Sequence, residues 1–100
     1  MEIYNIKIYP VAKRDLREII DYLNTLSPDA AIRYYDLIIS KISSLTTMPY
    51  RCPQVRNSVL KSKGYRFLVV DNYIVFFVVQ DETVQIRRIL YNKQNYENLL

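Results

Sequence analysis

The sequence predicts an α+β domain in which two helices pack on one face of a mainly antiparallel sheet. Two patterns predict this fold. Apolar residues recur at helical spacing in the first half, and three runs of β-branched and aromatic residues fill most of residues 65–90. The chain has 100 residues, of which 50% are hydrophobic. This size supports one hydrophobic core and is too small for two, so residues 1–100 are predicted to form a single domain.

The first half predicts an N-terminal strand followed by an αα-hairpin. Residues 2–8 alternate apolar and polar side chains, which is typical of a half-buried strand. Pro10 suits the first turn of a helix, and an amphipathic stripe follows it up to a short break at residues 24–27. Ser27 then supplies a capping hydroxyl, with a proline and an aspartate directly after it. This second helix is expected to end near Thr46.

Residues 47–63 are predicted to be a long connection. Pro49 and Pro53 both restrict the residue before them, so the second helix cannot continue through this segment. Connections of this length in small domains are often functional. Cys52 is interpreted as a packed thiol, because the chain has no histidine that would activate it as a nucleophile.

The second half predicts a three-stranded antiparallel meander and a short tail. The strands are expected over residues 65–70, 73–79 and 84–90. Residues 73–79 contain no strongly polar side chain, which is typical of a central strand covered on both faces. The first strand must join an edge or the middle of this meander, and periodicity does not decide which. The polar tail, residues 92–100, is expected to form at most a short helical turn.

The last predicted strand places a charged residue on an apolar face. Its apolar positions of one parity are Val84, Ile86 and Leu90. Arg88 interrupts this series, and a guanidinium on an apolar face must be paired or point into a cleft. The structural interpretation is an ion pair with Glu18 or Asp21 of the first helix, and the functional interpretation is a phosphate contact. Arg87, on the opposite parity, is expected to be exposed.

The net charge of +4 is concentrated in the second half of the chain. Residues 1–50 hold six basic and six acidic residues, whereas residues 51–100 hold eight and four. An acid-free basic stretch contains Arg51, Arg56, Lys61, Lys63 and Arg66. Such a stretch attracts phosphate-bearing or acidic partners, so these residues and Arg87 are the candidates for target or phosphate binding. The alternative is a solvated loop that keeps the protein soluble.

Composition excludes several kinds of chemistry. Without histidine and with one cysteine, the chain lacks the usual general base and the usual metal ligands, so we expect no metal and no cofactor. The single cysteine cannot form an internal disulfide, and no apolar run approaches the roughly 18 residues that cross a bilayer. We therefore expect a cytoplasmic protein without a membrane partner. Ten tyrosines against three phenylalanines suit either interfaces or half-buried core edges.

Several short, weakly specific sequence motifs occur along the chain in the order found in one protein family. These motifs, or marks, lie at residues 10–12, 15–16, 19–22, 48–49, 64–66, 72–77 and 88–91. With them, the chain resembles the RelE/ParE superfamily of toxins from type II toxin–antitoxin systems over essentially its whole length. The resemblance implies a cytoplasmic toxin that inhibits growth, as in plasmid stabilisation. It also implies a cognate antitoxin whose disordered segment folds over the toxin, in a complex that is oligomeric.

The superfamily holds two mechanisms. RelE-like members are mRNA interferases that enter the ribosome and cut messenger RNA, which needs a base for the 2′-hydroxyl, cations for the developing charge and an acid for the leaving oxygen. When the sequence is compared with the catalytic residues of RelE-like members, Arg66 falls at a position where they carry a basic residue. Leu68 stands where they carry a second cation. Ile74 stands where a strand arginine should follow the tyrosine. Lys93 and Tyr96 lie roughly where a tail arginine and tyrosine sit.

The second mechanism is binding without bond breaking. The Gly-Tyr-Arg, Val-Phe-Phe and Arg-Ile-Leu marks resemble ParE-like members, which inhibit DNA gyrase by binding and carry no nuclease set. We therefore predict a ParE-like gyrase inhibitor. The alternatives are a RelE-like ribosome-dependent mRNA endonuclease, with Arg66, Arg88, Lys93 and Tyr96 as its candidate catalytic residues, and a basic nucleic-acid-binding module. Whether the chain is an enzyme stays open at this point.

Overall fold

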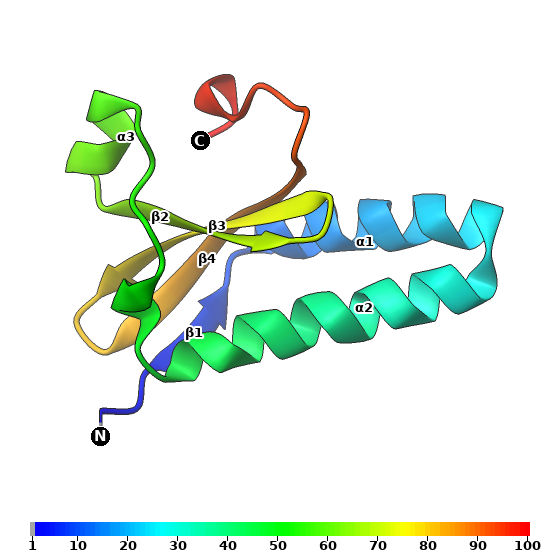
Figure 1. The fold of residues 1–100 in the computed structure, drawn as a ribbon, viewed down its shortest axis with the longest axis horizontal. Coiled ribbons are helices and arrows are strands. Elements are labelled where there is room, and N and C mark those ends of the chain that lie inside the picture. Colours follow the sequence, from blue (N-terminus) through cyan, green and yellow to red (C-terminus); the bar gives the residue numbers. More distant parts are fainter. Residues whose placement is uncertain (1) are drawn as a thin grey trace.

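The computed structural model describes residues 2–100, and its fold is drawn in Figure 1. The helices are α1 (Pro10–Leu26), α2 (Pro28–Ser43) and α3 (Ser58–Ser62), with short 3-10 turns η1 (Ser44–Thr46), η2 (Pro49–Arg51) and η3 (Tyr96–Asn98). The strands are β1 (Asn5–Ile8), β2 (Tyr65–Val70), β3 (Tyr73–Gln80) and β4 (Thr83–Tyr91). The predicted strand, helical hairpin and meander are all present in this order.

The sheet has the order β1-β4-β3-β2. β2, β3 and β4 form the predicted antiparallel meander, whereas β1 pairs with β4 in parallel. The structure thus places the first strand at an edge of the sheet. β3 lies between two partners, and Val75, Phe76 and Phe77 at its centre are at most 1% exposed, which confirms the expected central strand.

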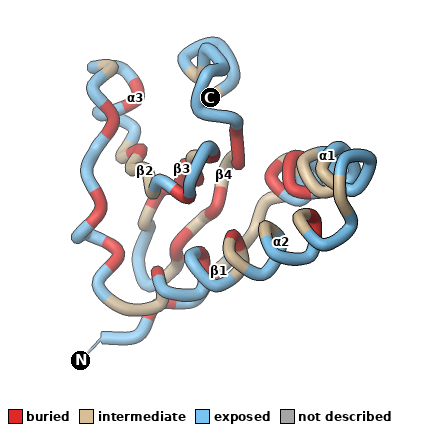
Figure 2. The backbone as a smooth tube through the Cα atoms, turned by 45° about the vertical axis from the view of Figure 1, so that its right-hand side comes forward, coloured by how far each residue is buried: buried red, intermediate tan, exposed pale blue. Residues whose placement is uncertain are grey.

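The two faces of the sheet are covered by different parts of the chain (Figures 1 and 2). α1 and α2 pack on one face, as predicted, over a cluster that includes Phe77, Ile86 and Ile38. The segment around α3 and the C-terminal tail cover the other face, over a second cluster that includes Phe76 and Leu90. We refer to these as the helix face and the tail face. The second cover was not predicted, because short apolar contacts from a loop and a tail have no periodicity.

The connection at residues 47–63 has more structure than predicted. It contains η2 and α3, the latter capped by Asn57, whose side chain accepts a hydrogen bond from the amide of Leu60 at 3.0 Å. Before α3, the chain also pairs with the outer edge of β2, through hydrogen bonds from Val55 N to Tyr65 O and from Phe67 N to Pro53 O. The edge of β2 is therefore covered by backbone from the connection.

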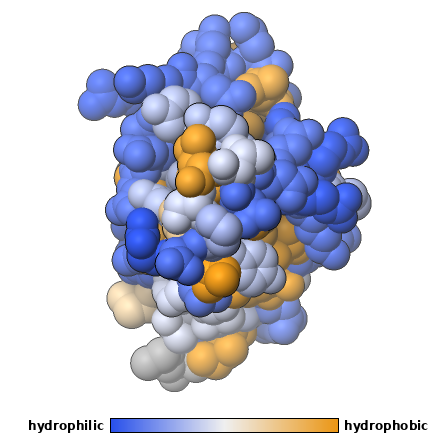
Figure 3. Space-filling view, turned by 90° about the vertical axis from the view of Figure 1, so that its right-hand side faces the viewer, coloured by the Kyte–Doolittle hydropathy of each residue, from blue (hydrophilic) through white to orange (hydrophobic). Residues whose placement is uncertain are grey.

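The hairpin break is shorter than predicted. Residues 24–26 continue α1, and only Ser27 separates it from α2. Within this last turn of α1, the hydroxyl of Thr25 donates to the carbonyl of Tyr22 at 2.6 Å. The hairpin extends beyond the sheet (Figure 1), and its far end mixes polar and apolar side chains on the surface that Figure 3 faces. Leu26 and Ile32 are about two-thirds exposed there, at 66% and 64%.

A β-bulge in β4 changes which residues share a face. Phe77 pairs with Ile86, and the preceding Phe76 pairs with Arg88, so Arg87 has no partner on β3. The bulge reverses the alternation, and Leu90 lies on the tail face while Ile86 lies on the helix face. The predicted common face of Val84, Ile86, Arg88 and Leu90 is therefore wrong. One extra residue moved the second half of the strand to the opposite parity.

Candidate functional site

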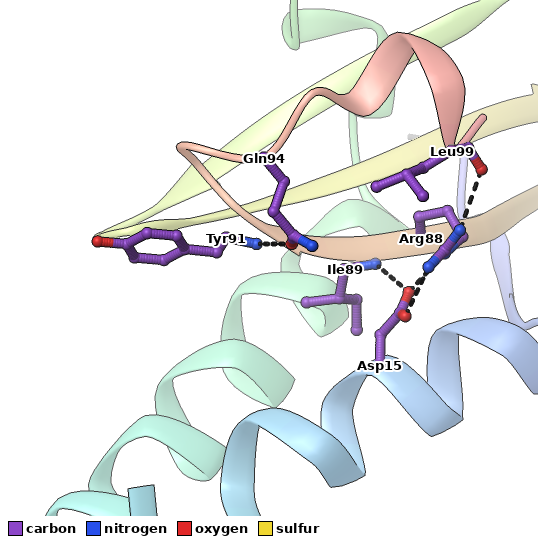
Figure 4. Close-up of polar contacts among 6 residues, drawn as sticks. All are labelled: Asp15, Arg88, Ile89, Tyr91, Gln94 and Leu99. Atoms are coloured by element: carbon purple, nitrogen blue, oxygen red, sulfur yellow. Dashed lines mark hydrogen bonds and ion pairs between the residues drawn. The ribbon is translucent and has the colours of Figure 1, made fainter. Parts of the chain in front are cut away.

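Arg88 is held by Asp15 of α1 (Figure 4). Its Nε and Nη2 donate to the two carboxylate oxygens at 2.7 and 2.9 Å, and its Nη1 donates to the carbonyl of Leu99 at 3.0 Å. The hydrogen bonds to Asp15 raise the pKa of Arg88. The ion pair that the sequence suggested is present, but its acid is Asp15, and neither Glu18 nor Asp21 pairs with it. Asp15 is the acid on the side of α1 that packs against β4, and it is 8% exposed.

The same carboxylate caps an open strand edge. β1 ends at Ile8, opposite Ile86, so among the residues that the structure describes β4 has no strand neighbour on that side beyond this point. The amide of Ile89 donates to Asp15 Oδ2 at 3.0 Å, and the amide of Tyr91 donates to the side-chain oxygen of Gln94 at 2.9 Å. Side chains therefore satisfy two backbone donors that a further strand would otherwise satisfy.

A groove of about 670 Å³ lies beside this edge, between α1, the end of β4 and the tail. Its apolar wall includes Ile19, Tyr22, Tyr73, Tyr91 and Leu99. Tyr22, Tyr91 and Leu99 are 62%, 41% and 39% exposed, which is high for large apolar or aromatic side chains. The groove is thus an apolar surface that ends at a sheet edge, and such surfaces accept peptide segments.

Two of the predicted phosphate-binding residues are used in local structure. The guanidinium of Arg51 donates to the carbonyls of Thr47 and Met48 at 2.9 and 3.1 Å and to the hydroxyl of Ser44 at 2.9 Å. Arg66 donates to the carbonyl of Cys52 at 2.7 Å and lies 4.9 Å from the ring centroid of Tyr50. Both side chains tie down the turn after α2, so fewer of their donors are free for a ligand.

The other predicted phosphate-binding residues fall into two groups. Arg56, Lys61 and Lys63 are exposed, on α3 or beside it, and make no polar side-chain contact within residues 2–100. Arg87 is half-buried, because it lies against the rings of Tyr9 and Tyr65. The prediction that it is exposed is therefore wrong. The structure therefore separates the basic cluster into anchored, exposed and ring-stacked cations.

The four nuclease candidates do not form one cluster. Arg88 and Tyr96 lie near each other on the tail face, because Phe76 pairs with Arg88 and its ring is 4.9 Å from that of Tyr96. Arg66 points to the other face, between two tail-face residues of β2, and contacts the Cys52 backbone. Lys93 is exposed in the tail. Leu68 and Ile74, at positions where the nucleases carry cations, pack against the helix-face and tail-face clusters respectively.

Sequence reasoning missed Asp15 and the tyrosines of the groove. A signal for Asp15 exists, since it falls between Ala12 and Ile19 at helical spacing and so places an acid within an apolar stripe. The groove has no such signal, because its residues come from α1, β3, β4 and the tail. Within residues 2–100, no group of three or more cysteine or acidic side chains is placed to hold a metal ion. No helix among the same residues has the length and apolar character needed to cross a membrane.

The fold is similar to those of solved toxin–antitoxin proteins. A chain of the chromosomal ParDE system from P. aeruginosa superposes with a TM-score of 0.76 and 22% identity, covering 91% of this chain and 98% of that chain. A chain of a RelBE toxin–antitoxin complex from Mycobacterium tuberculosis superposes with a TM-score of 0.61 and 20% identity, covering 89% and 98%. No curated protein sequence matches. The fold is thus that of the RelE/ParE class of toxins.

The family model places the chain more narrowly within this class. The model of the ParE toxin of type II toxin–antitoxin systems, parDE, matches residues 6–96. The chain therefore belongs to the ParE toxin family. This result confirms the resemblance and the choice of the ParE-like branch over the RelE-like branch.

Proposed function

We propose that this ParE-family toxin acts in the cytoplasm and arrests growth by binding DNA gyrase, without cutting messenger RNA. The observation that carries the proposal is the arrangement of the nuclease candidates. Arg66 is turned away from Tyr96, and Leu68 and Ile74 replace cations with apolar side chains that pack in the two clusters. A site that loses such cations is expected to lose about 10²-fold or more in rate per group. A binding mechanism needs none of them.

Purified toxin tests the two mechanisms directly. We expect it to inhibit supercoiling by gyrase in a concentration-dependent manner and to leave messenger RNA intact on programmed ribosomes. Cleavage of the message in the ribosomal A site, with supercoiling unaffected, would establish the RelE-like alternative instead. Toxin first mixed with its antitoxin serves as the control in both assays, because neutralised toxin should be inactive in either.

A cognate antitoxin is the second part of the proposal. Both structural relatives come from toxin–antitoxin pairs. The groove between α1, β4 and the tail offers exposed apolar side chains next to a strand edge that side chains cap in place of a neighbouring strand, which suits a segment that folds on binding. We propose that the antitoxin segment inserts apolar side chains between Tyr22 and Leu99, within a complex that is oligomeric.

Two exposed helix tyrosines provide a matched test of this groove. Tyr22 lines the groove, whereas Tyr35 of α2 is also exposed, at 46%, and lies outside it. Tyr22→Ser should weaken antitoxin binding by about tenfold or more, since a buried aromatic anchor carries much of an interface's energy. Tyr35→Ser should change it by less than about twofold. Equal affinities of the two variants would place the antitoxin elsewhere while leaving the gyrase assay unaffected.

A further inference from the structure

Arg87 and Arg88 are adjacent in β4 but differ in charge compensation. Arg88 is paired with Asp15, and that is the single ion pair within residues 2–100. Arg87 is half-buried and has no carboxylate within ion-pair distance in the same range. The bulge causes the difference, because Arg87 is the extra residue and Arg88 reaches the open edge beside α1. A partly desolvated guanidinium without an acid keeps its charge for an anion, and its planar fork of donors matches the geometry of a phosphate group.

Neutral side chains fix the guanidinium of Arg87 in one orientation. Its Nε and Nη2 donate to the side-chain oxygen of Gln85 at 3.2 and 2.8 Å, and its Nη1 lies 3.4 Å from the hydroxyl oxygen of Tyr65. Its carbon lies 4.7 Å from the ring centroid of Tyr9 and 5.8 Å from that of Tyr65. A guanidinium has five N–H donors, so one on each terminal nitrogen is left for a ligand.

A second cation lies beside the same ring. Lys7 Nζ is 5.3 Å from the ring centroid of Tyr9, and the guanidinium carbon of Arg87 is 4.7 Å from the same centroid. Both cations therefore contact one tyrosine ring. Lys7 is exposed and is the register partner of Gln85, which holds Arg87. Side chains of register partners in parallel strands point to the same face, so the two cations flank Tyr9 on one side of the sheet.

We propose that Arg87 and Lys7 form a binding site for a phosphate group. The two free terminal N–H groups of Arg87 suit two oxygens of one phosphate, and Lys7 adds a second positive charge beside the same tyrosine ring. Because Gln85, Tyr9 and Tyr65 already orient the guanidinium, little side-chain entropy is lost on binding. The phosphate belongs either to a nucleic-acid backbone or to a small phosphate ion. The site goes beyond gyrase inhibition and does not depend on it.

The test compares two arginines that each stack on a tyrosine. Arg33 of α2 lies 5.6 Å from the ring of Tyr34, and it is exposed on another part of the surface. Binding of a short fluorescein-labelled duplex DNA to the full chain is measured by anisotropy over a range of salt concentrations. Arg87→Gln should weaken binding by about tenfold and lower the salt slope by about one, whereas Arg33→Gln should change affinity by less than about threefold.

Inorganic phosphate, titrated while the NMR signals of the Arg87 and Gln85 side chains are followed, separates the two sources. If inorganic phosphate shifts these NMR signals to saturation and DNA does not bind, the site is one for a small phosphate. If DNA binds and its binding depends on Arg87, the site is one for a nucleic-acid backbone.

If Arg87→Gln does not fold by circular dichroism, the exposed Lys7→Gln replaces it, with an expected weakening of about threefold or more. Equal losses in the arginine variants, or no effect of Arg87→Gln or its replacement on either probe, would overturn the proposal. Weaker binding of Arg87→Gln to gyrase or antitoxin, with both phosphate probes unaffected, would identify an acidic protein as the ligand and would also overturn it.

Discussion

The carboxylate of Asp15 bonds both the side chain of Arg88 and the backbone amide of Ile89, so one acid on α1 closes an open edge of β4. The contact joins residues more than seventy positions apart in the sequence. It neutralises a cation that the bulge leaves beside the helix, and it fixes α1 along the sheet at the groove. This pair is therefore the structural link between the helical hairpin and the proposed antitoxin surface.

Breaking this pair should destabilise the toxin. Asp15→Ala leaves a partly buried guanidinium and the amide of Ile89 without their acceptor, so we expect a loss of about 2–4 kcal/mol in the free energy of unfolding. Asp15→Asn, which keeps one oxygen for these donors, should lose less. Urea unfolding followed by circular dichroism measures both. Asp21→Ala, an exposed acid on the same helix, is the control and should stay within about 0.5 kcal/mol of the unaltered chain.

Stability should fall in mildly alkaline solution because of Cys52. Burial raises the pKa of this thiol, with Arg51 and Arg66 opposing the shift in part. In the unfolded chain the thiol has its ordinary pKa of about 8.5, so as pH rises it loses its proton at a lower pH than in the folded chain. The unfolded state is therefore increasingly favoured between the unfolded and the folded pKa of the thiol. The free energy of unfolding, measured between pH 7 and 9.5, should decrease over this window.

Cys52→Ala removes the ionisable group and should flatten that decrease, although it costs some stability at every pH because the site is 4% exposed. An equal pH dependence in Cys52→Ala and the unaltered chain would mean that the thiol is not its origin. The buried tyrosines Tyr4 and Tyr73 also have raised pKa values, but their ordinary pKa of about 10 places their effect above this window.

Tyr96→Phe should leave toxicity in cells unchanged. The ring of Tyr96 packs on Phe76, and its hydroxyl makes no hydrogen bond within residues 2–100, so phenylalanine preserves its contacts. Growth arrest on induced expression measures the effect. A nuclease that uses this hydroxyl for proton transfer would lose its toxicity in the same variant, with folding intact.

Arg66→Ala should lower stability more than toxicity. Its hydrogen bond to the Cys52 carbonyl and its contact with Tyr50 hold the turn before β2, and their loss should cost about 1–2 kcal/mol. We expect a lower melting temperature but continued gyrase inhibition at a temperature where the variant is folded. Full loss of activity in a folded variant would make Arg66 a functional residue of the nuclease type.

Gly64→Ala should be destabilised through the backbone. Gly64 has a φ of +86°, which L side chains rarely adopt, and an added Cβ would meet Val78 Cγ1 at 3.6 Å, an ordinary contact. The expected loss is about 1 kcal/mol in urea unfolding and reflects conformation alone. Ser62→Ala, an exposed position two residues earlier, provides the comparison and should have a smaller effect.

Local patterns were sufficient for the fold class and for the main helices and strands, although they did not predict η2, α3 or the full extent of α1. The stripe after Pro10, the cap at Ser27 and the apolar run of residues 73–79 each depend on neighbours in the sequence, and each forms the expected element. The ParE-like marks at residues 64–66 and 75–77 lie at the start of β2 and within β3. Such features are encoded within a few residues, because helix and strand periods place nearby side chains on a common face.

Long-range packing decided the rest. The edge position of β1, the choice of Asp15 as the partner of Arg88 and the separation of Arg66 from Tyr96 all follow from contacts between distant segments. The bulge at Arg87 is the clearest case, because one residue without a partner reverses the parity on which the sequence argument about Arg88 depended. Periodicity carries no information about such an insertion, since the pairing with β3 that creates it exists only once the sheet has formed.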